Sequence, residues 1–454
     1  MKTRKEENKT SFPAISSFFI IVVLLIHCNC KIPFLSKEKE DNSFLLLGLF
    51  AFNQPQGYQW NLPPGFPVPR VPEDNPMSQE KVDLGRQLFY ENQLSGNNTK
   101  SCGSCHFQRL AFSDGKILST GIAGDKTTRN SQPLFNVAYN ARQTWNNILL
   151  ISLEQQMHVP LFGENPVELG LSIREEEIRE RLRGIKNYPE LFRKAFPAEA
   201  EPINVTNIIK SIASFQRSMI SGNSAFDKAT YQGQASRLSP SARRGFNFFS
   251  SEIAECFHCH DGINFNDSTF HSNTSAKIEP LYHNNALYNV AGTGNPSSNL
   301  GLIEVTGNSA HRGGFKTPSL RNIALTFPYM HDGSISCDDN LNPNLPVGQA
   351  NGATINGCAT QALGRVIDHY SNGGFNSTCG AFTTGDTRNT SFPCSPHITE
   401  YGGNSALAPN PQSTVDTTLI RRFPIQPQEK TDLINFLLSL TDEEFIVDPR
   451  FSRP

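Results

Sequence analysis

Two stretches of the chain repeat the same helical pattern of apolar and polar residues. Ser78, a residue type that often begins helices, precedes the phrase Gly85-Arg86-Gln87-Leu88-Phe89, whose bulky apolar residues share one helical face. Ser239-Pro240 precedes a similar phrase, Gly245-Phe246-Asn247-Phe248-Phe249. Because a glycine inside a helix costs about 1 kcal/mol relative to alanine, we expect another helix to cross closely at both glycines.

Two later stretches each carry an apolar stripe at helical spacing. The first stripe consists of Ile208, Ile212, Phe215 and Met219, and the second of Leu433, Phe436, Leu437 and Leu440. Stripes of this kind usually pack into a hydrophobic core. No long stretch alternates between apolar and polar residues as a strand would. The pattern predicts a mainly α fold of two similar halves with long connecting loops.

A Cys-x-x-Cys-His motif follows each copy of the repeated helix. The motifs are Cys102-Gly103-Ser104-Cys105-His106 and Cys256-Phe257-His258-Cys259-His260. The two thiols of such a motif can add to the vinyl groups of haem while the histidine ligates the iron. The motifs stand about 150 residues apart, too far for a zinc ribbon, and a thioredoxin-type redox pair needs no histidine. We therefore expect two covalently bound haems c, with His258 facing solvent.

The repeats and motifs divide the 454-residue chain into four parts. Residues 1–30 form a signal segment, and the proline-rich residues 31–75 form an extended lead-in. Residues 76–235 form an N-terminal cytochrome c domain, and residues 236–454 form a C-terminal one. The two domains are joined near residues 220–238, and the second carries a cysteine-bearing insertion at residues 334–400.

The N-terminus has the features of an export signal. A basic start is followed by a mainly apolar stretch, residues 12–26, which is short for a membrane span. Three outcomes stay open: simple cleavage, a lipoprotein acylated at Cys28 or Cys30, and a retained anchor helix. All three place the rest of the chain outside the cytoplasm, so we expect a periplasmic protein that is either free or attached to the membrane by lipid.

Charge and cysteine usage fit that compartment. The formal net charge is -2, and no basic run indicates nucleic-acid binding. Four of the ten cysteines, Cys337, Cys358, Cys379 and Cys394, lie in the insertion, and in an oxidising compartment they are expected to form two disulfides. Three connectivities are open; nearest-neighbour pairing, Cys337 with Cys358 and Cys379 with Cys394, is favoured.

From about residue 76 to the C-terminus the chain resembles the bacterial dihaem cytochrome c peroxidase and MauG family. The resemblance is carried by the two haem motifs, Asn136-Val137-Ala138-Tyr139-Asn140, Trp145, residues 218–224 and, most specifically, residues 315–333. It implies a peroxidatic N-terminal haem, which reduces hydrogen peroxide, and a C-terminal haem that relays electrons.

The same resemblance implies roles for individual residues. The proximal iron ligands would be His106 and His260. The residue between the haems would be Trp145, and a polar pair over the peroxide site would be Gln156 and Glu168. The calcium ligands would be Asn130, Thr326 and the carbonyl of Pro328, a hard-oxygen set that suits Ca²⁺. Residues packed near the C-terminal haem would be Arg321 and His331.

Two positions distinguish subtypes within the family. Classical peroxidases place a histidine over the first haem, but Ile122 stands at that position here and cannot ligate iron. We therefore expect the first haem to be open at rest, as in MauG-like members. For the sixth ligand of the second haem we favour Tyr370, which ends the helical phrase beginning at Leu363, over Met330 and His369.

These expectations favour a peroxidase supplied with electrons by an exported donor, such as a small cytochrome c or a copper protein. In that reading Glu168 and Gln156 assist proton transfer during O–O cleavage. One alternative is a MauG-like oxidase that acts on a protein substrate to mature a cofactor. Another is a dihaem electron carrier without enzymatic activity. A homodimer is compatible with the sequence, which does not specify the oligomeric state.

Overall fold

The computed structural model describes residues 57–274, 282–287, 299–337, 352–371, 374, 420 and 423–454. The signal segment and the predicted Cys379–Cys394 disulfide lie outside these residues. Residues Gly57–Pro454 cluster as one unit. Residues 57–78 contain no helix. No helix among the described residues is long and apolar enough to cross a membrane.

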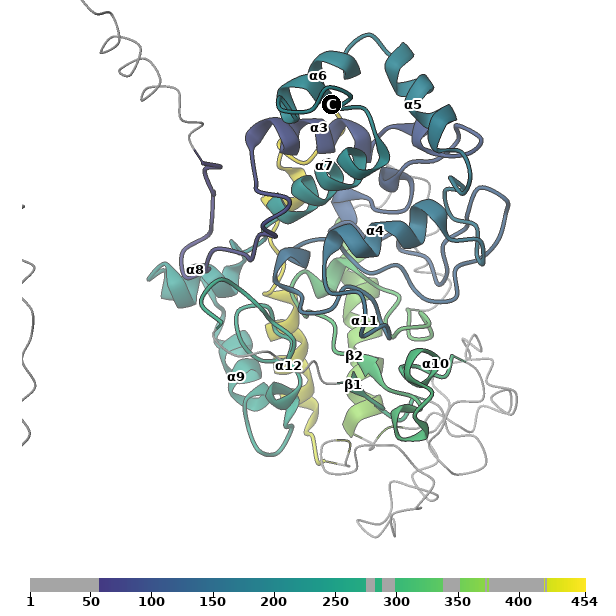
Figure 1. The fold of residues 1–454 in the computed structure, drawn as a ribbon. Helices are drawn as coiled ribbons and strands as arrows, with labels where there is room; N and C mark the ends of the chain where they lie inside the picture. The colour runs from purple at the N-terminus through teal and green to yellow at the C-terminus, as the bar shows by residue number, and fades with distance from the viewer. Residues whose placement is uncertain are drawn as a thin grey trace, which may run out of the picture. The chain divides into compact units, whose positions relative to one another are not determined.

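The first half is built around the helix pair α3 (Gln79–Phe89) and α7 (Val205–Ser218), with α4 (Leu153–Phe162), α5 (Glu175–Gly184) and α6 (Tyr188–Ala195) around it (Figure 1). The Ser78 side chain accepts a hydrogen bond from Lys81 N at 3.2 Å and begins α3, as predicted. A Cβ on Gly85 would lie 1.9 Å from Ser211 O, so α3 and α7 cross where only glycine fits. The predicted close approach at Gly85 is confirmed.

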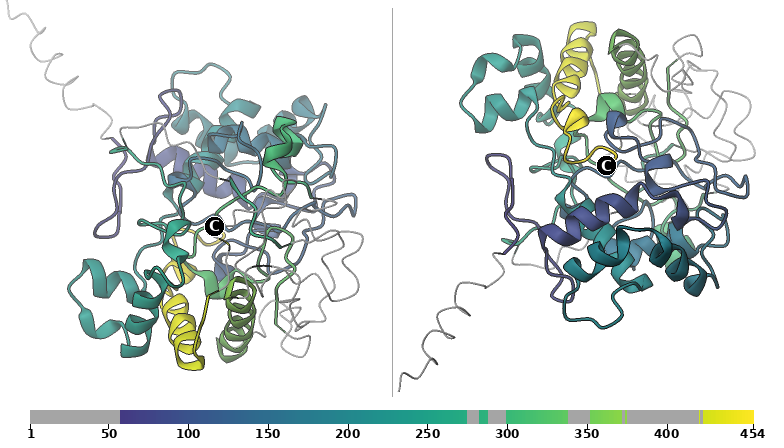
Figure 2. Two further views of the ribbon diagram at one scale, coloured as in Figure 1. Left: turned by 90° about the horizontal axis from the view of Figure 1, so that it is seen from below. Right: turned by 90° about the horizontal axis from the view of Figure 1, so that it is seen from above.

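The second half repeats this crossing. It contains α8 (Ala225–Tyr231), α9 (Pro240–Phe249), α10 (Ile303–Thr306), α11 (Gly352–Ser371) and α12 (Pro427–Leu438). Helix α12 lies between α9 and α11 in every view (Figures 1 and 2). A Cβ on Gly245 would lie 1.9 Å from Asp432 O, the same distance as at the first crossing. The internal repeat predicted from sequence is therefore also a structural repeat.

Each half has its own hydrophobic core, and the predicted stripes on α7 and α12 are buried in them. The first core also receives the end of the chain. Phe445 and Phe451 belong to it. Tyr90 donates a hydrogen bond to the carbonyl of Phe451 at 2.7 Å, and Gln108 donates one to the carbonyl of Asp448 at 2.8 Å. The C-terminal residues therefore leave the second half and complete the first.

Strand structure is minor in the described residues, as predicted. Strand β1 (Tyr282–His283) pairs antiparallel with β2 (Phe315–Lys316). The other short elements are 3-10 helices, namely η1 (Asn92–Leu94), η2 (Cys102–Ser104), η3 (Gln108–Leu110), η4 (Val137–Tyr139), η5 (Ala235–Arg237), η6 (Cys256–His258), η8 (Ser309–His311), η9 (Ile323–Leu325) and η13 (Phe445–Val447). The haem motifs lie on two of these short turns, η2 and η6.

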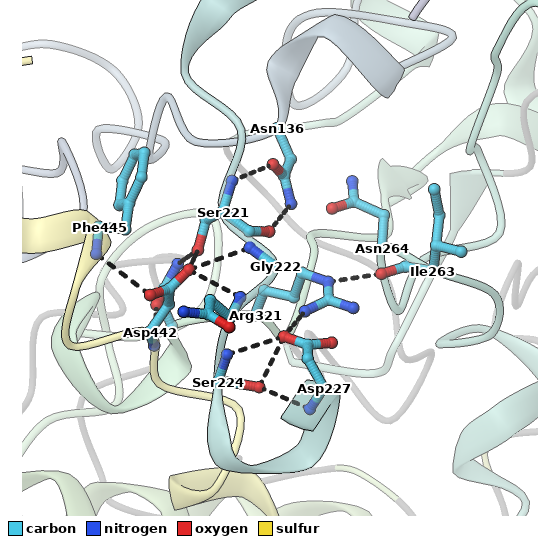
Figure 3. Close-up of polar contacts among 12 residues, drawn as sticks. Asn136, Ser221, Gly222, Ser224, Asp227, Ile263, Asn264, Arg321, Asp442 and Phe445 are labelled. Carbon is cyan, nitrogen blue, oxygen red and sulfur yellow. Dashed lines mark hydrogen bonds and ion pairs between the residues drawn. The ribbon is translucent and has the colours of Figure 1, made fainter. Parts of the chain in front are cut away.

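A buried polar cluster joins the two halves at residues 219–224 (Figure 3). Asn136 and Asn322 begin η4 and η9, and both adopt the left-handed backbone conformation, with φ of 55° and 54°. The Asn136 amide accepts from Ser221 N and donates to Ser221 O, each at 2.8 Å. The Asn322 amide donates to Ser221 Oγ at 2.9 Å and accepts from Asp442 N at 2.8 Å. Equivalent asparagines thus hold the junction from both sides.

Two buried carboxylates complete this cluster. Asp442 Oδ2 accepts hydrogen bonds from Ser221 Oγ, Gly222 N and Asn223 N, each at 3.0 Å. Asp227 Oδ2 forms an ion pair with Arg321 at 2.8 Å, and both side chains are almost fully buried. Because buried charges are stable only when they are paired or hydrogen-bonded, this arrangement fixes the junction between the halves.

Candidate functional site

The first motif presents its histidine in the orientation expected for an iron ligand. Cys102 and Cys105 lie at the two ends of the η2 turn, and His106 follows directly. His106 Nδ1 lies 2.6 Å from the carbonyl oxygen of Phe112, so Nδ1 carries the proton and Nε2 is left to bind a metal. Phe112 adopts a positive φ of 63°, which turns its carbonyl toward the ring.

The second motif repeats this arrangement. His260 Nδ1 lies 3.0 Å from the carbonyl oxygen of Phe265, another phenylalanine at positive φ, 48°. Burial lowers the pKa of both His106 and His260, which favours the neutral imidazole that ligates metals. The two cysteine pairs, each with an oriented histidine, are the donor set that haem c requires. His258 is exposed, as predicted.

A cavity of about 340 Å³ opens beside the first motif. Cys102, Cys105 and His106 line it together with the three residues predicted to act there, Trp145, Gln156 and Glu168. The structure therefore brings together side chains from four separate segments of the first half. The cavity is lined by both apolar and polar side chains and lies beside an oriented histidine and two thiols, as the binding site of a haem would.

Helix α4 and the loop after it supply the polar wall of this cavity. Gln156 lies one turn before Pro160, and both residues line the cavity with Glu168. Leu169 N donates to Pro160 O at 3.0 Å, which holds the Glu168 segment against the helix. Burial raises the pKa of Glu168. The role of Pro160 was not predicted from the sequence. A proline inside a helix is unusual, and that signal could have drawn attention to it.

The loop at residues 119–127 is fastened to the Glu168 segment by its backbone. Ile122 N donates to Glu168 O at 3.0 Å, and a Cβ on Gly121 would lie 1.8 Å from Val167 O. The Ile122 side chain packs against Gly96 and Gly170 rather than lining the cavity. Among the described lining residues, His106 is the only histidine, and the one thioether, Met157, belongs to the first hydrophobic core.

Trp145 connects the first cavity to the second half. Its Nε1 donates to Asn130 O at 2.8 Å, and its carbonyl accepts from Lys316 N at 2.7 Å. The His331 ring lies 6.5 Å from the Trp145 ring and stacks on Phe315 at 3.5 Å. Burial lowers the pKa of His331 to about 4, so this ring is neutral near pH 7. Three rings therefore form a continuous contact between the halves.

The predicted calcium ligands lie on two segments that meet. Asn130 N donates to His331 O at 2.8 Å, and His331 follows Thr326 and Pro328 closely in sequence. The Asn130 amide itself donates to Lys116 O at 2.7 Å, and Thr326 Oγ1 donates to Ile323 O at 3.4 Å. Within the described part of the chain, no hydrogen bond joins Asn130 directly to Thr326 or Pro328. The calcium site stays a prediction.

The second motif faces a different set of side chains. Tyr370, near the end of α11, packs against the same hydrophobic core as Cys256. Burial raises the pKa of Tyr370 to about 12, while a hydrogen bond from Asn285 Nδ2 to its hydroxyl, at 3.2 Å, opposes the shift. The same amide lies 3.5 Å from Met330 Sδ. Asn285 was not predicted.

The third candidate ligand, His369, is held by a backbone carbonyl through one ring nitrogen. Its Nε2 bonds to the carbonyl oxygen of Asn285 at 3.0 Å, and burial lowers its pKa to about 4. A ring nitrogen that donates to a backbone carbonyl cannot also bind a metal, so only Nδ1 of His369 is left as a possible ligand atom. Tyr370 and Met330, by contrast, both contact the Asn285 amide.

Arg321 supports the second motif from behind. Its Nε donates to Ile263 O at 2.5 Å, and its guanidinium lies over the Phe265 ring, 5.6 Å from the centroid. Phe265 is the residue whose carbonyl orients His260. Arg321 therefore connects the buried cluster at the junction between the halves to the second iron ligand, in keeping with its predicted place near the C-terminal haem.

Two further features near the second motif are structural. His283 Nε2 lies 2.7 Å from Asp267 Oδ2, and both groups are close to Cys259; this pair was not predicted.

The predicted Cys337–Cys358 disulfide is confirmed. It ties α11 to the segment that follows His331, so it joins the element carrying Tyr370 to the one carrying Met330.

Comparison with known proteins gives a consistent result. The family described as di-haem cytochrome c peroxidase matches residues 79–236. The methylamine utilization protein MauG of Methylorubrum extorquens is 31% identical over 303 residues, which are 67% of this chain and 72% of that protein. A cytochrome-c peroxidase of Pseudomonas sp. (strain SCT) is 35% identical over 288 residues, 60% of this chain and 73% of that protein.

Solved structures agree with these relatives. A MauG-like protein associated with microbial copper homeostasis is 39% identical, with a TM-score of 0.71 over 87% of this chain and 99% of that one. The diheme peroxidase BthA of Burkholderia thailandensis is 16% identical, with a TM-score of 0.56 over 86% of this chain and 98% of that one, and it shares the fold. The chain therefore belongs to the di-haem cytochrome c peroxidase and MauG family of oxidoreductases, and membership of this di-haem family implies two haems c.

Proposed function

We propose that this protein reduces hydrogen peroxide to water at the haem held by His106, with electrons relayed by the haem held by His260. The observation that carries the proposal is the composition of the first cavity. Gln156 and Glu168 line the same cavity as His106. The described lining residues include no second histidine that could ligate the haem iron from the opposite side. The haem, when bound, supplies the redox-active iron that accepts peroxide.

The protein's own part in the reaction is proton transfer and orientation. Glu168 lies in a partly dehydrated site that raises its pKa, so its carboxylate binds a proton more readily than an ordinary carboxylate does. It accepts a proton from one peroxide oxygen and returns it to the other, while the Gln156 amide orients the peroxide. Each hydrogen peroxide takes up two protons and two electrons and yields two waters.

Electron delivery follows the contact between the halves. Trp145, His331 and Phe315 form the ring contact described above, and the carbonyl of Trp145 binds β2. Tyr370 would complete the iron coordination of the second haem; the hydrogen bond from Asn285 to its hydroxyl and its packing against the same hydrophobic core as Cys256 support this role. The electron donor is an exported protein of small cytochrome c or copper type.

Two further parts of the proposal concern calcium and location. Asn130, Thr326 and Pro328 offer hard oxygen atoms near the Asn130–His331 backbone contact, so they would hold Ca²⁺ between the haem sites. Chelation should then slow electron transfer, and added Ca²⁺ should restore it. The Cys337–Cys358 disulfide supports an oxidising compartment, for which we propose the periplasm.

The decisive test uses the full-length holoprotein in its resting ferric state. The proposal predicts an electron paramagnetic resonance spectrum with one high-spin and one low-spin haem. It also predicts that peroxide is consumed without prior reduction of the protein. Two low-spin haems, together with a requirement for prior reduction, would contradict the open first haem.

A second candidate function is peroxide-dependent oxidation of a protein substrate. Leu149, Ile151 and Val159 are 67%, 55% and 42% exposed, and Val159 also lines the first cavity. An apolar rim beside the peroxide site favours contact with another protein. The 39%-identical MauG-like relative is associated with copper homeostasis, so a copper protein is the substrate to try first. Covalent change in that protein, without turnover of reduced cytochrome c, would favour this candidate.

A further inference from the structure

One amide lies between the two candidate ligands of the second haem. Asn285 Nδ2 donates to Tyr370 Oη at 3.2 Å and lies 3.5 Å from Met330 Sδ. An amide nitrogen carries two hydrogens, so it can serve both partners at once. Because a thioether sulfur accepts hydrogen bonds but cannot donate them, the nitrogen of the amide faces this side and the oxygen faces away.

Asn285 is held in this orientation by its own backbone. Its carbonyl oxygen accepts the bond from His369 Nε2 at 3.0 Å, and His369 directly precedes Tyr370 on α11. Asn284 Oδ1 accepts from Ala286 N at 3.0 Å and shapes the same turn. Asn285 is therefore attached to α11 at two points, one through its backbone and one through its side chain.

We propose that Asn285 is a positioning residue that keeps Tyr370, and not Met330, as the sixth ligand of the second haem. The inference rests on the proposed function, in which Tyr370 ligates that iron. Asn285 does not orient His106 or His260, and it is not among the described residues that line the first cavity.

The physical reason is that the Asn285 amide stabilises Tyr370 as a ligand and hinders Met330 from ligating the iron. A hydrogen bond to the phenol oxygen fixes its direction, and it becomes charge-assisted when that oxygen is anionic. The bond to Met330 is weaker, but it occupies one of the two sulfur lone pairs and holds the thioether against the amide. Charge-assisted bonds are worth about 1.5–3 kcal/mol, so removal of the amide should raise the ratio of Met330-ligated to Tyr370-ligated protein by about tenfold or more.

The test compares ferric spectra of the holoprotein and three variants. Asn285→Ala should show the absorption band of thioether-ligated ferric haem, which the unaltered protein lacks. Asn285→Ala combined with Met330→Leu should lose that band again. Asn284→Ala removes a side chain that shapes the same turn through its hydrogen bond from Ala286 N, so it should keep the original spectrum. Comparable binding of haem in all variants would establish that they fold.

The outcomes separate this inference from the proposed function. If Tyr370→Phe leaves the second haem's spectrum unchanged, the ligand assignment in the proposed function is wrong. If Tyr370→Phe changes the spectrum but Asn285→Ala does not, only the role of Asn285 is wrong. An Asn285→Ala protein that loses Tyr370 ligation without gaining the thioether band, or an Asn284→Ala protein that gains the band, also overturns the inference.

Discussion

The two haem pockets share their construction on the histidine side and differ on the opposite side. His106 and His260 are each oriented by the carbonyl of a phenylalanine at positive φ. The first pocket is then walled by α4 and the backbone-fastened loop at residues 119–127. The second meets α11 and Asn285. The repeated halves thus orient their histidines alike, while unrepeated segments form the opposite sides of the two pockets.

The largest effect should come from removing the acid–base group of the first pocket. Glu168→Gln should lower peroxide turnover by about 10²–10⁴-fold, because the amide cannot carry the proton between the peroxide oxygens. Steady-state kinetics measures the loss. Glu164→Gln is the matched control, since Glu164 is an exposed carboxylate in the same loop that bonds to Ser172. Turnover unaffected by Glu168→Gln would contradict the role of this pocket.

Exchange of the ligand in the second pocket should shift its potential. Tyr370→Met should raise the reduction potential of the second haem by on the order of 0.2 V, because a neutral thioether stabilises the ferrous state better than a phenolate does. Spectroelectrochemical titration resolves the two haems. The reduction potential of the first haem should change much less than that of the second. An equal change at both haems would mean that the pockets are not independent.

The shared construction can be tested at the twin helix crossings. Gly85→Ala and Gly245→Ala should each lower the free energy of unfolding by about 1–3 kcal/mol, because the added Cβ would meet a backbone carbonyl. Thermal unfolding of the holoprotein measures both. Gly184→Ala should change stability by no more than about 0.5 kcal/mol, since no atom outside its own helix backbone and chain neighbours lies within 4 Å of that Cβ. Unequal losses at the two crossings would show that the halves are not equivalent.

The last prediction concerns the dependence of peroxide turnover on pH. Burial raises the pKa of Glu168, and the reaction needs its carboxylate form as the base. Peroxide turnover should therefore fall as the pH drops through this raised pKa, by about tenfold per pH unit below it. The fall should begin at a higher pH than an ordinary carboxyl group would give. If the Glu168→Gln variant loses peroxide turnover at acidic pH in the same way, another group is responsible for that loss.

The sequence predicted the repeated parts of the molecule well. Glycines inside apolar helices predicted the crossings at Gly85 and Gly245, because few other causes place glycine there. Serine caps predicted where α3 and α9 begin. The residues assigned to the first cavity, Trp145, Gln156 and Glu168, came from the family resemblance, and the structure brings them together.

Other features depend on contacts between distant segments and could not be predicted. Asn285 is one of many asparagines in loops, and only the fold brings it to Tyr370, 85 positions away. The same is true of Asp442, which binds the backbone of Gly222 and Asn223. Phe112 and Phe265 orient the histidines through carbonyl groups, which every residue has, so side-chain identity carries no signal for that role.

The return of the chain's end to the first core sets an order of events during synthesis. Phe445 packs 5.8 Å from Phe112, whose carbonyl orients His106, and Phe451 packs 6.4 Å from Phe215. Ribosomes make these two phenylalanines after the residues that they pack against. The first haem pocket therefore cannot reach its final packing until Phe451 has been made, so the half that is translated first is completed only after the second half has been translated.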